Sequence, residues 1–125
     1  MPTLYEPLPE WLQDSLTKRV EAELLRLHIP QTTAGFHHAA YAITQVIQNP
    51  ETVNWITKEI YPETARHFQT RPANIERTIR LAVRACWERG GRDILEEMAG
   101  IHLTQRPTNS EFLAIVANYI RPRLG

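Results

Sequence analysis

The sequence lacks the features that mark secreted and membrane proteins. Its single cysteine, Cys86, cannot form a disulfide within the chain, and this is typical of proteins in a reducing compartment. No run of about 18 apolar residues occurs, so we expect no membrane-spanning helix. Residues 1–10 contain neither the basic nor the apolar region of a signal peptide. We therefore expect a cytoplasmic protein.

Residues suited to metal binding or catalysis are few and badly spaced. His37 and His38 are adjacent, so on a helix they point about 100° apart and cannot chelate one metal ion. Gly90 and Gly91 follow a predicted helix, whereas a phosphate-binding loop opens one. Cys86 falls on an apolar helix face, where a core role is more common than a nucleophilic one. We expect no metal, no cofactor and no enzymatic activity.

The chain also has no net charge, because 14 basic residues balance 14 acidic ones. The charges are unevenly spread: residues 1–30 carry three basic and five acidic side chains, whereas residues 61–90 carry six arginines and three glutamates. Screening limits each charge to about 8–10 Å at physiological ionic strength, so the local patch decides attraction to phosphates. Neutrality predicts weak non-specific affinity for DNA and leaves a sequence-specific reader possible.

Apolar residues at helical spacing are what the sequence has in quantity. Leu16, Val20 and Leu24 illustrate the pattern, and no segment shows the two-residue alternation of a strand. We predict one domain over residues 16–125, preceded by a proline-containing arm over residues 1–15. The fold class is therefore all-α, a compact bundle of about six helices, with helical segments at 16–28, 34–48, 50–60, 62–68, 70–89, 94–99 and 108–120.

Capping residues predict where several of these helices start. Asn49 before Pro50 is typical of an N-cap followed by a first-turn proline. Thr70 can cap the helix that continues to Arg89. Thr108 and Glu111 have the spacing of a capping box.

Two of the predicted helices fit a helix-turn-helix. Residues 62–68 and 70–89 are separated by a very short turn, and Ala65 is small where the two helices must approach. Gln69 occupies the turn, where glycine is common, so an ordinary helical hairpin stays open as the alternative.

A helical wheel divides the segment 70–89 into an apolar face and a face of long polar side chains. Arginine can donate two hydrogen bonds to guanine, and glutamate can accept one from cytosine. The alternative is a solvated face held by intrahelical ion pairs, for instance Glu76 with Arg80. The inward residues are Ile75, Ile79, Ala82, Val83 and Cys86. The candidate DNA-contacting residues are Thr70, Arg71, Asn74, Glu76, Arg77, Arg80 and Arg84.

Several stretches resemble a known family, the C-terminal effector domain of the stage zero sporulation protein A response regulators. They are Tyr61-Pro62, Ile75-Glu76-Arg77 with Ile79-Arg80, Trp87, and the block from Pro107 to Phe112. The resemblance extends over residues 16–120. It implies a six-helix bundle that binds tandem TGTCGAA-like boxes in double-stranded DNA, self-associates there and contacts RNA polymerase sigma factors. Base reading by Glu76 and Arg77, with Arg80 as a further contact, is implied in the same way.

The chain departs from the family pattern at several positions of the segment 70–89, most of them near its start. Ala73 and Asn74 replace a usual Ser-Arg pair, Leu81 replaces a common histidine, and Arg71-Pro72 replaces small residues. We expect these changes to alter DNA affinity more than the fold. The family's receiver domain has no counterpart before Leu16, as in a trimmed chain or a receiver-less protein. The alternative function is a receiver-less protein-interaction module that modulates a full-length regulator or RNA polymerase without strong DNA binding.

Overall fold

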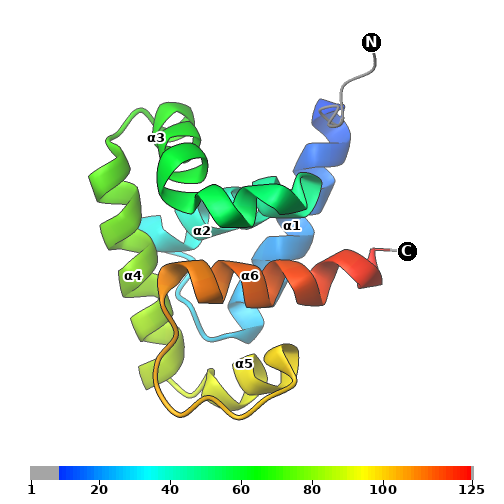
Figure 1. Ribbon diagram of the computed structural model, residues 1–125, viewed down its shortest axis with the longest axis vertical. Helices are drawn as coiled ribbons and strands as arrows, with labels where there is room; N and C mark the ends of the chain where they lie inside the picture. Colours follow the sequence, from blue (N-terminus) through cyan, green and yellow to red (C-terminus); the bar gives the residue numbers. More distant parts are fainter. Residues whose placement is uncertain (1–8, 125) are drawn as a thin grey trace.

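A computed structural model describes residues 9–124 and shows six α-helices with no strand in that range, as the sequence predicts (Figure 1). Short 3-10 and π segments complete the helical structure. The elements are α1 (Glu10–Arg26), α2 (Ala34–Gln48), η1 (Pro50–Trp55), η2 (Ile56–Ile60), α3 (Tyr61–Phe68), α4 (Pro72–Glu88), α5 (Arg92–Ala99), α6 (Asn109–Ile120) and η3 (Arg121–Arg123).

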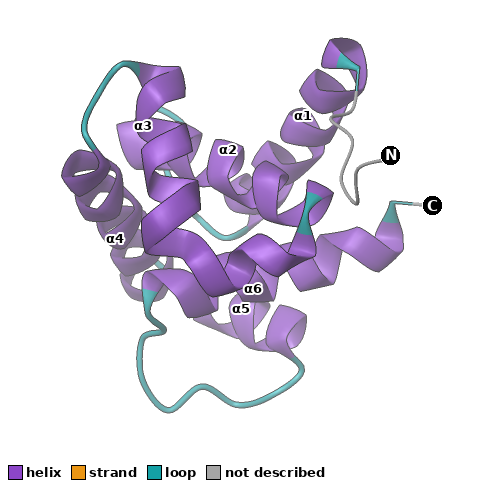
Figure 2. Ribbon diagram, turned by 45° about the horizontal axis from the view of Figure 1, so that its top comes forward, coloured by secondary structure: helices purple, strands orange, loops and turns teal. Residues whose placement is uncertain are grey.

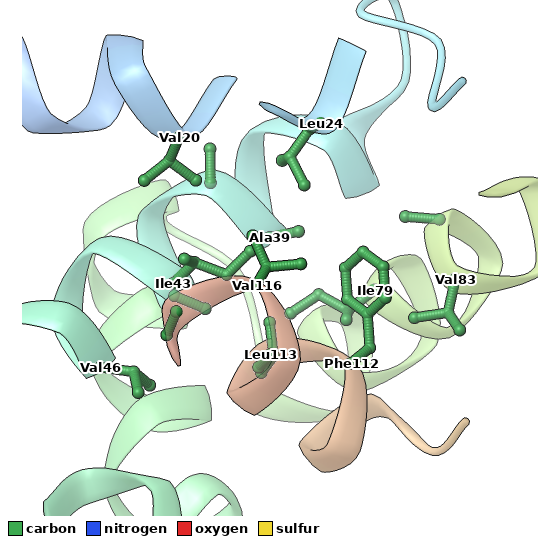
Figure 3. Packing of buried hydrophobic residues seen from close by; sticks show 14 of the residues in the cluster. Val20, Leu24, Ala39, Ile43, Val46, Ile79, Val83, Phe112, Leu113 and Val116 are labelled. Carbon is green, nitrogen blue, oxygen red and sulfur yellow. The ribbon is translucent and has the colours of Figure 1, made fainter. Parts of the chain in front are cut away.

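Helix α2 is the centre of the bundle, because α1, α4 and α6 all pack against it (Figure 1). It is apolar on most of its surface, as a helix surrounded by others must be. Phe36 of α2 and Phe112 of α6 are fully buried. The core joins side chains from these four helices, among them Val20, Leu24, Ala39, Ile43, Val46, Ile79, Val83, Phe112, Leu113 and Val116 (Figure 3).

The first helix starts earlier than the sequence predicts. Residues 10–15 were assigned to an irregular arm because of the nearby prolines, but α1 begins at Glu10. The carbonyl of Pro9 accepts hydrogen bonds from the amides of Leu12 and Gln13, both at 3.0 Å. A proline at a helix start loses nothing, because its missing N–H would have no partner there. The rest of the predicted arm, residues 1–8, lies outside the described residues.

The single α-helix predicted over residues 50–60 is wrong in type. Residues Pro50–Trp55 form a 3-10 helix, and Ile56–Ile60 form a π-helix that continues into α3 (Figure 2). Asn49 makes no side-chain cap; instead its carbonyl accepts a hydrogen bond from the Thr52 hydroxyl at 2.7 Å. Ile56 and Ile60 are nonetheless buried. Apolar spacing alone does not separate these helix types when the buried positions coincide.

The turn between α3 and α4 is held by one residue in the left-handed conformation. Gln69 has φ 56° and ψ 49°, and the amide of Thr70 donates to the carbonyl of Ala65 at 2.9 Å. The predicted cap by Thr70 is wrong: Arg71 is the N-cap residue of α4 and makes no side-chain cap. The Thr70 hydroxyl accepts a hydrogen bond from the Asn74 side-chain amide at 3.1 Å. Pro72 at the first turn displaces the helix start by two residues.

Helix α4 lies unusually close to α2. A Cβ atom on Gly35 would lie 2.2 Å from the carbonyl oxygen of Thr78, so only glycine fits at this crossing. One turn along α2, the Nδ1 atom of the buried His38 lies 2.6 Å from the Thr78 hydroxyl. The His38 ring also packs edge-on against Phe68 of α3, with 4.7 Å between ring centroids. The two helices of the helix-turn-helix are thus fixed on α2 together.

Helix α6 supports α4 from a second side. Its predicted capping box is confirmed, because Thr108 and Glu111 exchange both side-chain-to-backbone hydrogen bonds. Asn109, the first residue of α6, donates to the Tyr61 hydroxyl and to the backbone carbonyl of Glu76, both at 3.0 Å. One amide group therefore joins the starts of α6 and α3 to the first half of α4.

Replacing Gln69 with glycine should raise the free energy of unfolding by about 0.5–1 kcal/mol. Glycine removes the Cβ strain of the left-handed conformation but gains freedom in the unfolded chain, and the strain is the larger effect. Urea unfolding checks this. The control Gln69→Ala keeps the Cβ and should not be stabilised; an equal gain in both variants would contradict the assignment.

Replacing Asn109 with alanine should lower the free energy of unfolding by about 1–3 kcal/mol, because two partly buried polar groups lose their partner. Asn118→Ala is the matched control on the same helix. Asn118 is exposed and bonds only to Arg121 in the described structure, so its loss should cost less than about 0.5 kcal/mol. Similar losses in both variants would show that Asn109 does not join the helices.

The pKa of His38 is lowered from 6.5, first by burial and then by the neighbouring His37. The unfolded chain therefore takes up a proton before the folded protein does. The His38 contribution to stability should be complete above about pH 6.5 and fall as the pH decreases toward the lower folded pKa. Urea unfolding across this range should show a smaller pH dependence in His38→Gln than in the parent; equal dependences would contradict this.

Candidate nucleic-acid interface

The exposed face of α4 carries three arginines, Arg77, Arg80 and Arg84, which we call the arginine face. The Arg80 and Arg84 side chains are 54% and 57% exposed. Every residue predicted to point inward from this helix is buried, and α4 covers the outer edge of the bundle in Figure 1. A major groove admits one α-helix, and α4 lies at the outer edge of the bundle in Figures 1 and 2.

The arginines are paired on their own helix. Arg80 Nε lies 3.0 Å from Glu76 Oε1, and Arg84 Nε lies 3.0 Å from Glu88 Oε1. The ion pair that the alternative interpretation of this face predicted, Glu76 with Arg80, is therefore formed. Exposed ion pairs of this kind contribute only about 0–1 kcal/mol. Such pairs orient the guanidinium groups, and little free energy is lost when a guanidinium leaves its glutamate for another partner.

A chain of hydrogen bonds connects the turn to the arginine face. Asn74 donates to the Thr70 hydroxyl and, through Oδ1, accepts a hydrogen bond of 2.8 Å from Arg77 Nη2. Arg71 stands exposed at the N-cap, and its side chain forms no hydrogen bond or ion pair within residues 9–124. All seven candidate residues belong to α4 or to the turn before it, and each is exposed or partly exposed.

Sequence analysis did not predict the groove that borders the arginine face. This groove of about 460 Å³, which we call the α4–α6 groove, separates α4 from residues 106–110, which we call its wall. Tyr61 lies in its floor, where burial raises the pKa of the phenol. The block Pro107–Phe112 carried the resemblance to the family, and this was the one sequence signal that pointed to the wall. Nothing in its spacing indicated that it borders α4.

Other reactive groups lie apart from this surface. Burial raises the pKa of Cys86 to about 12, so the thiol stays protonated in the core. His37 faces Glu21 at 3.6 Å and the carbonyl of Gln31 at 3.0 Å on the surface. Within residues 9–124 no three potential metal ligands come together. No helix in that range is long and apolar enough to cross a membrane.

The family comparison covers the whole bundle. A family model described as sporulation initiation factor Spo0A C terminal matches residues 20–120, from the middle of α1 to the end of α6. The match includes the helix-turn-helix, the arginine face and the wall of the α4–α6 groove. It confirms the resemblance carried by Pro107–Phe112 and by the Ile75-Glu76-Arg77 run. The chain belongs to the Spo0A C-terminal family of sporulation-initiation domains, which bind double-stranded DNA as transcription regulators and are not a family of enzymes.

Proposed function

We propose that this chain regulates transcription by inserting α4 into the major groove and reading boxes that resemble TGTCGAA. The observation that carries the proposal is the arginine face, whose back is fixed to α2 and α6 while its front is exposed. Rigid support matters because base-edge hydrogen bonds require a fixed helix position.

The residues of α4 take different roles in this proposal. Arg77 donates two hydrogen bonds to guanine O6 and N7, and Glu76 accepts one from a cytosine amino group. Arg80 exchanges its Glu76 pair for DNA, at a small cost since the pair is exposed. Arg71 and Arg84 contact the backbone at the two ends of the inserted segment.

Asn74 has a supporting role in this proposal, and the sequence alone did not indicate it. It replaces an arginine of the family pattern, which removes one positive charge. Its amide is already bonded to Thr70 and Arg77, so it orients Arg77. The turn residue Thr70 holds Asn74 in that position. We infer that position 74 makes no charged contact with DNA in this chain. Asn74 instead holds Arg77 in the orientation needed to bind a base.

Two further partners follow from family membership as proposals. Tandem boxes would bring copies of the domain side by side, so self-association on DNA is expected. Contact with an RNA polymerase sigma factor would connect binding to transcription. The competing proposal is a protein-interaction module that acts without strong DNA binding. The ion pairs of Arg80 and Arg84 with glutamates of α4 favour it, because they neutralise part of the positive charge that would attract DNA.

Replacing Arg77 with alanine should weaken binding to a TGTCGAA-like duplex by about 1–3 kcal/mol and have little effect on a scrambled duplex. Fluorescence anisotropy at one stated salt concentration measures both. Arg123→Ala is the control: Arg123 is exposed and belongs to η3, and the C-terminal end of the chain lies across the molecule from α4 (Figure 1). It should leave both affinities unchanged.

Two outcomes would overturn parts of this proposal. Equal affinity of the unmodified protein for matched and scrambled duplexes would remove sequence-specific reading. A silent Arg77→Ala variant, combined with loss of activity on deleting residues 1–10, would favour the protein-interaction module.

A further inference from the structure

The α4–α6 groove contains one cation outside the helix-turn-helix. Arg106 lines this groove together with Glu76 and Arg80 of α4. The groove therefore continues directly from the arginine face, and a duplex seated on α4 has one of its strands beside this wall. The composition of this groove is favourable for a phosphate backbone, because Thr108 and Ser110 add hydroxyl groups and, among residues 9–124, Glu76 is the one carboxylate that lines it.

The charge of Arg106 is uncompensated in the described structure. Arg106 is exposed and forms no hydrogen bond or ion pair with residues 9–124. The three residues of the arginine face differ, since each bonds to an acidic or amide side chain of α4 itself. An exposed guanidinium that neutralises no partner of its own can bind a phosphate without first breaking an ion pair.

The position of Arg106 is fixed relative to α4. Pro107, which follows it, is buried, and Thr108 closes the capping box with Glu111. Asn109, three positions after Arg106, then donates to the Glu76 carbonyl and bonds this segment directly to α4. The backbone at Arg106 is therefore already fixed, and binding has to order only its side chain.

We propose that Arg106 is a DNA phosphate contact, holding the backbone of the strand that runs along the α4–α6 groove while α4 occupies the major groove. The inference rests on the proposed DNA-reading function and adds a contact outside the helix-turn-helix. A phosphate contact fixes the register of the protein on the duplex and carries no base information. Its loss should therefore weaken all duplexes alike.

The test is Arg106→Gln, measured by anisotropy on matched and scrambled duplexes over a series of salt concentrations. Losing one phosphate contact should make the slope of log affinity against log salt shallower by about 0.9, and should lower affinity for both duplexes about fivefold near physiological salt. Lys18→Gln is the charge-matched control. Lys18 is exposed on α1, and its side chain has no hydrogen bond or ion pair among the described residues. Its replacement should change neither quantity.

The outcomes separate this proposal from the function on which it rests. An unchanged slope in Arg106→Gln, or a loss confined to the matched duplex, would overturn the phosphate contact even if Arg77→Ala behaves as expected. If the unmodified protein binds both duplexes equally, specific reading fails while the slope still decides the role of Arg106. No binding to either duplex would reject both proposals. Equal thermal midpoints for Arg106→Gln and the parent would exclude a folding defect.

Discussion

Helices α2 and α4 cross where Gly35 leaves no room for a side chain above the Thr78 carbonyl. Everything that the surface of α4 does depends on this crossing, because it sets the distance and angle at which the helix leaves the bundle. His38 extends the contact by bonding to the Thr78 hydroxyl and packing on Phe68. Asn109 adds a third fixed point from α6. These three contacts hold the buried side of α4 in a fixed position, so its exposed side is fixed as well.

The charges of the chain are balanced both overall and on the exposed face of α4. Equal numbers of acidic and basic residues give no long-range attraction to DNA. The arginine face is itself partly neutralised by Glu76 and Glu88. Such a surface is suited to discrimination, since attraction must come from short-range contacts made in the correct register. We therefore expect weak non-specific binding to DNA.

The membership of the chain in the Spo0A C-terminal family fits this picture of a fixed, self-paired reading surface. Most of the differences that the resemblance indicates lie at the start of α4, at Arg71-Pro72 and Ala73-Asn74, and Leu81 lies farther along the helix. The structure accommodates them locally: Pro72 opens the helix, and Asn74 bonds to the turn and to Arg77. The bundle behind them keeps the core that α2 organises.

The sequence alone determined the helical class, the inward face of α4 and the capping box of α6, because apolar spacing and capping chemistry are local properties. It misplaced the start of α1 and the type of residues 50–60, since a proline can open a helix as readily as it can interrupt one and apolar spacing is shared by neighbouring helix types. Only the tertiary structure decided that Gly35, His38 and Asn109 fix α4, and that Arg106 borders it. These contacts join residues between 33 and 48 positions apart or elements that are not consecutive, and no local pattern encodes such distances.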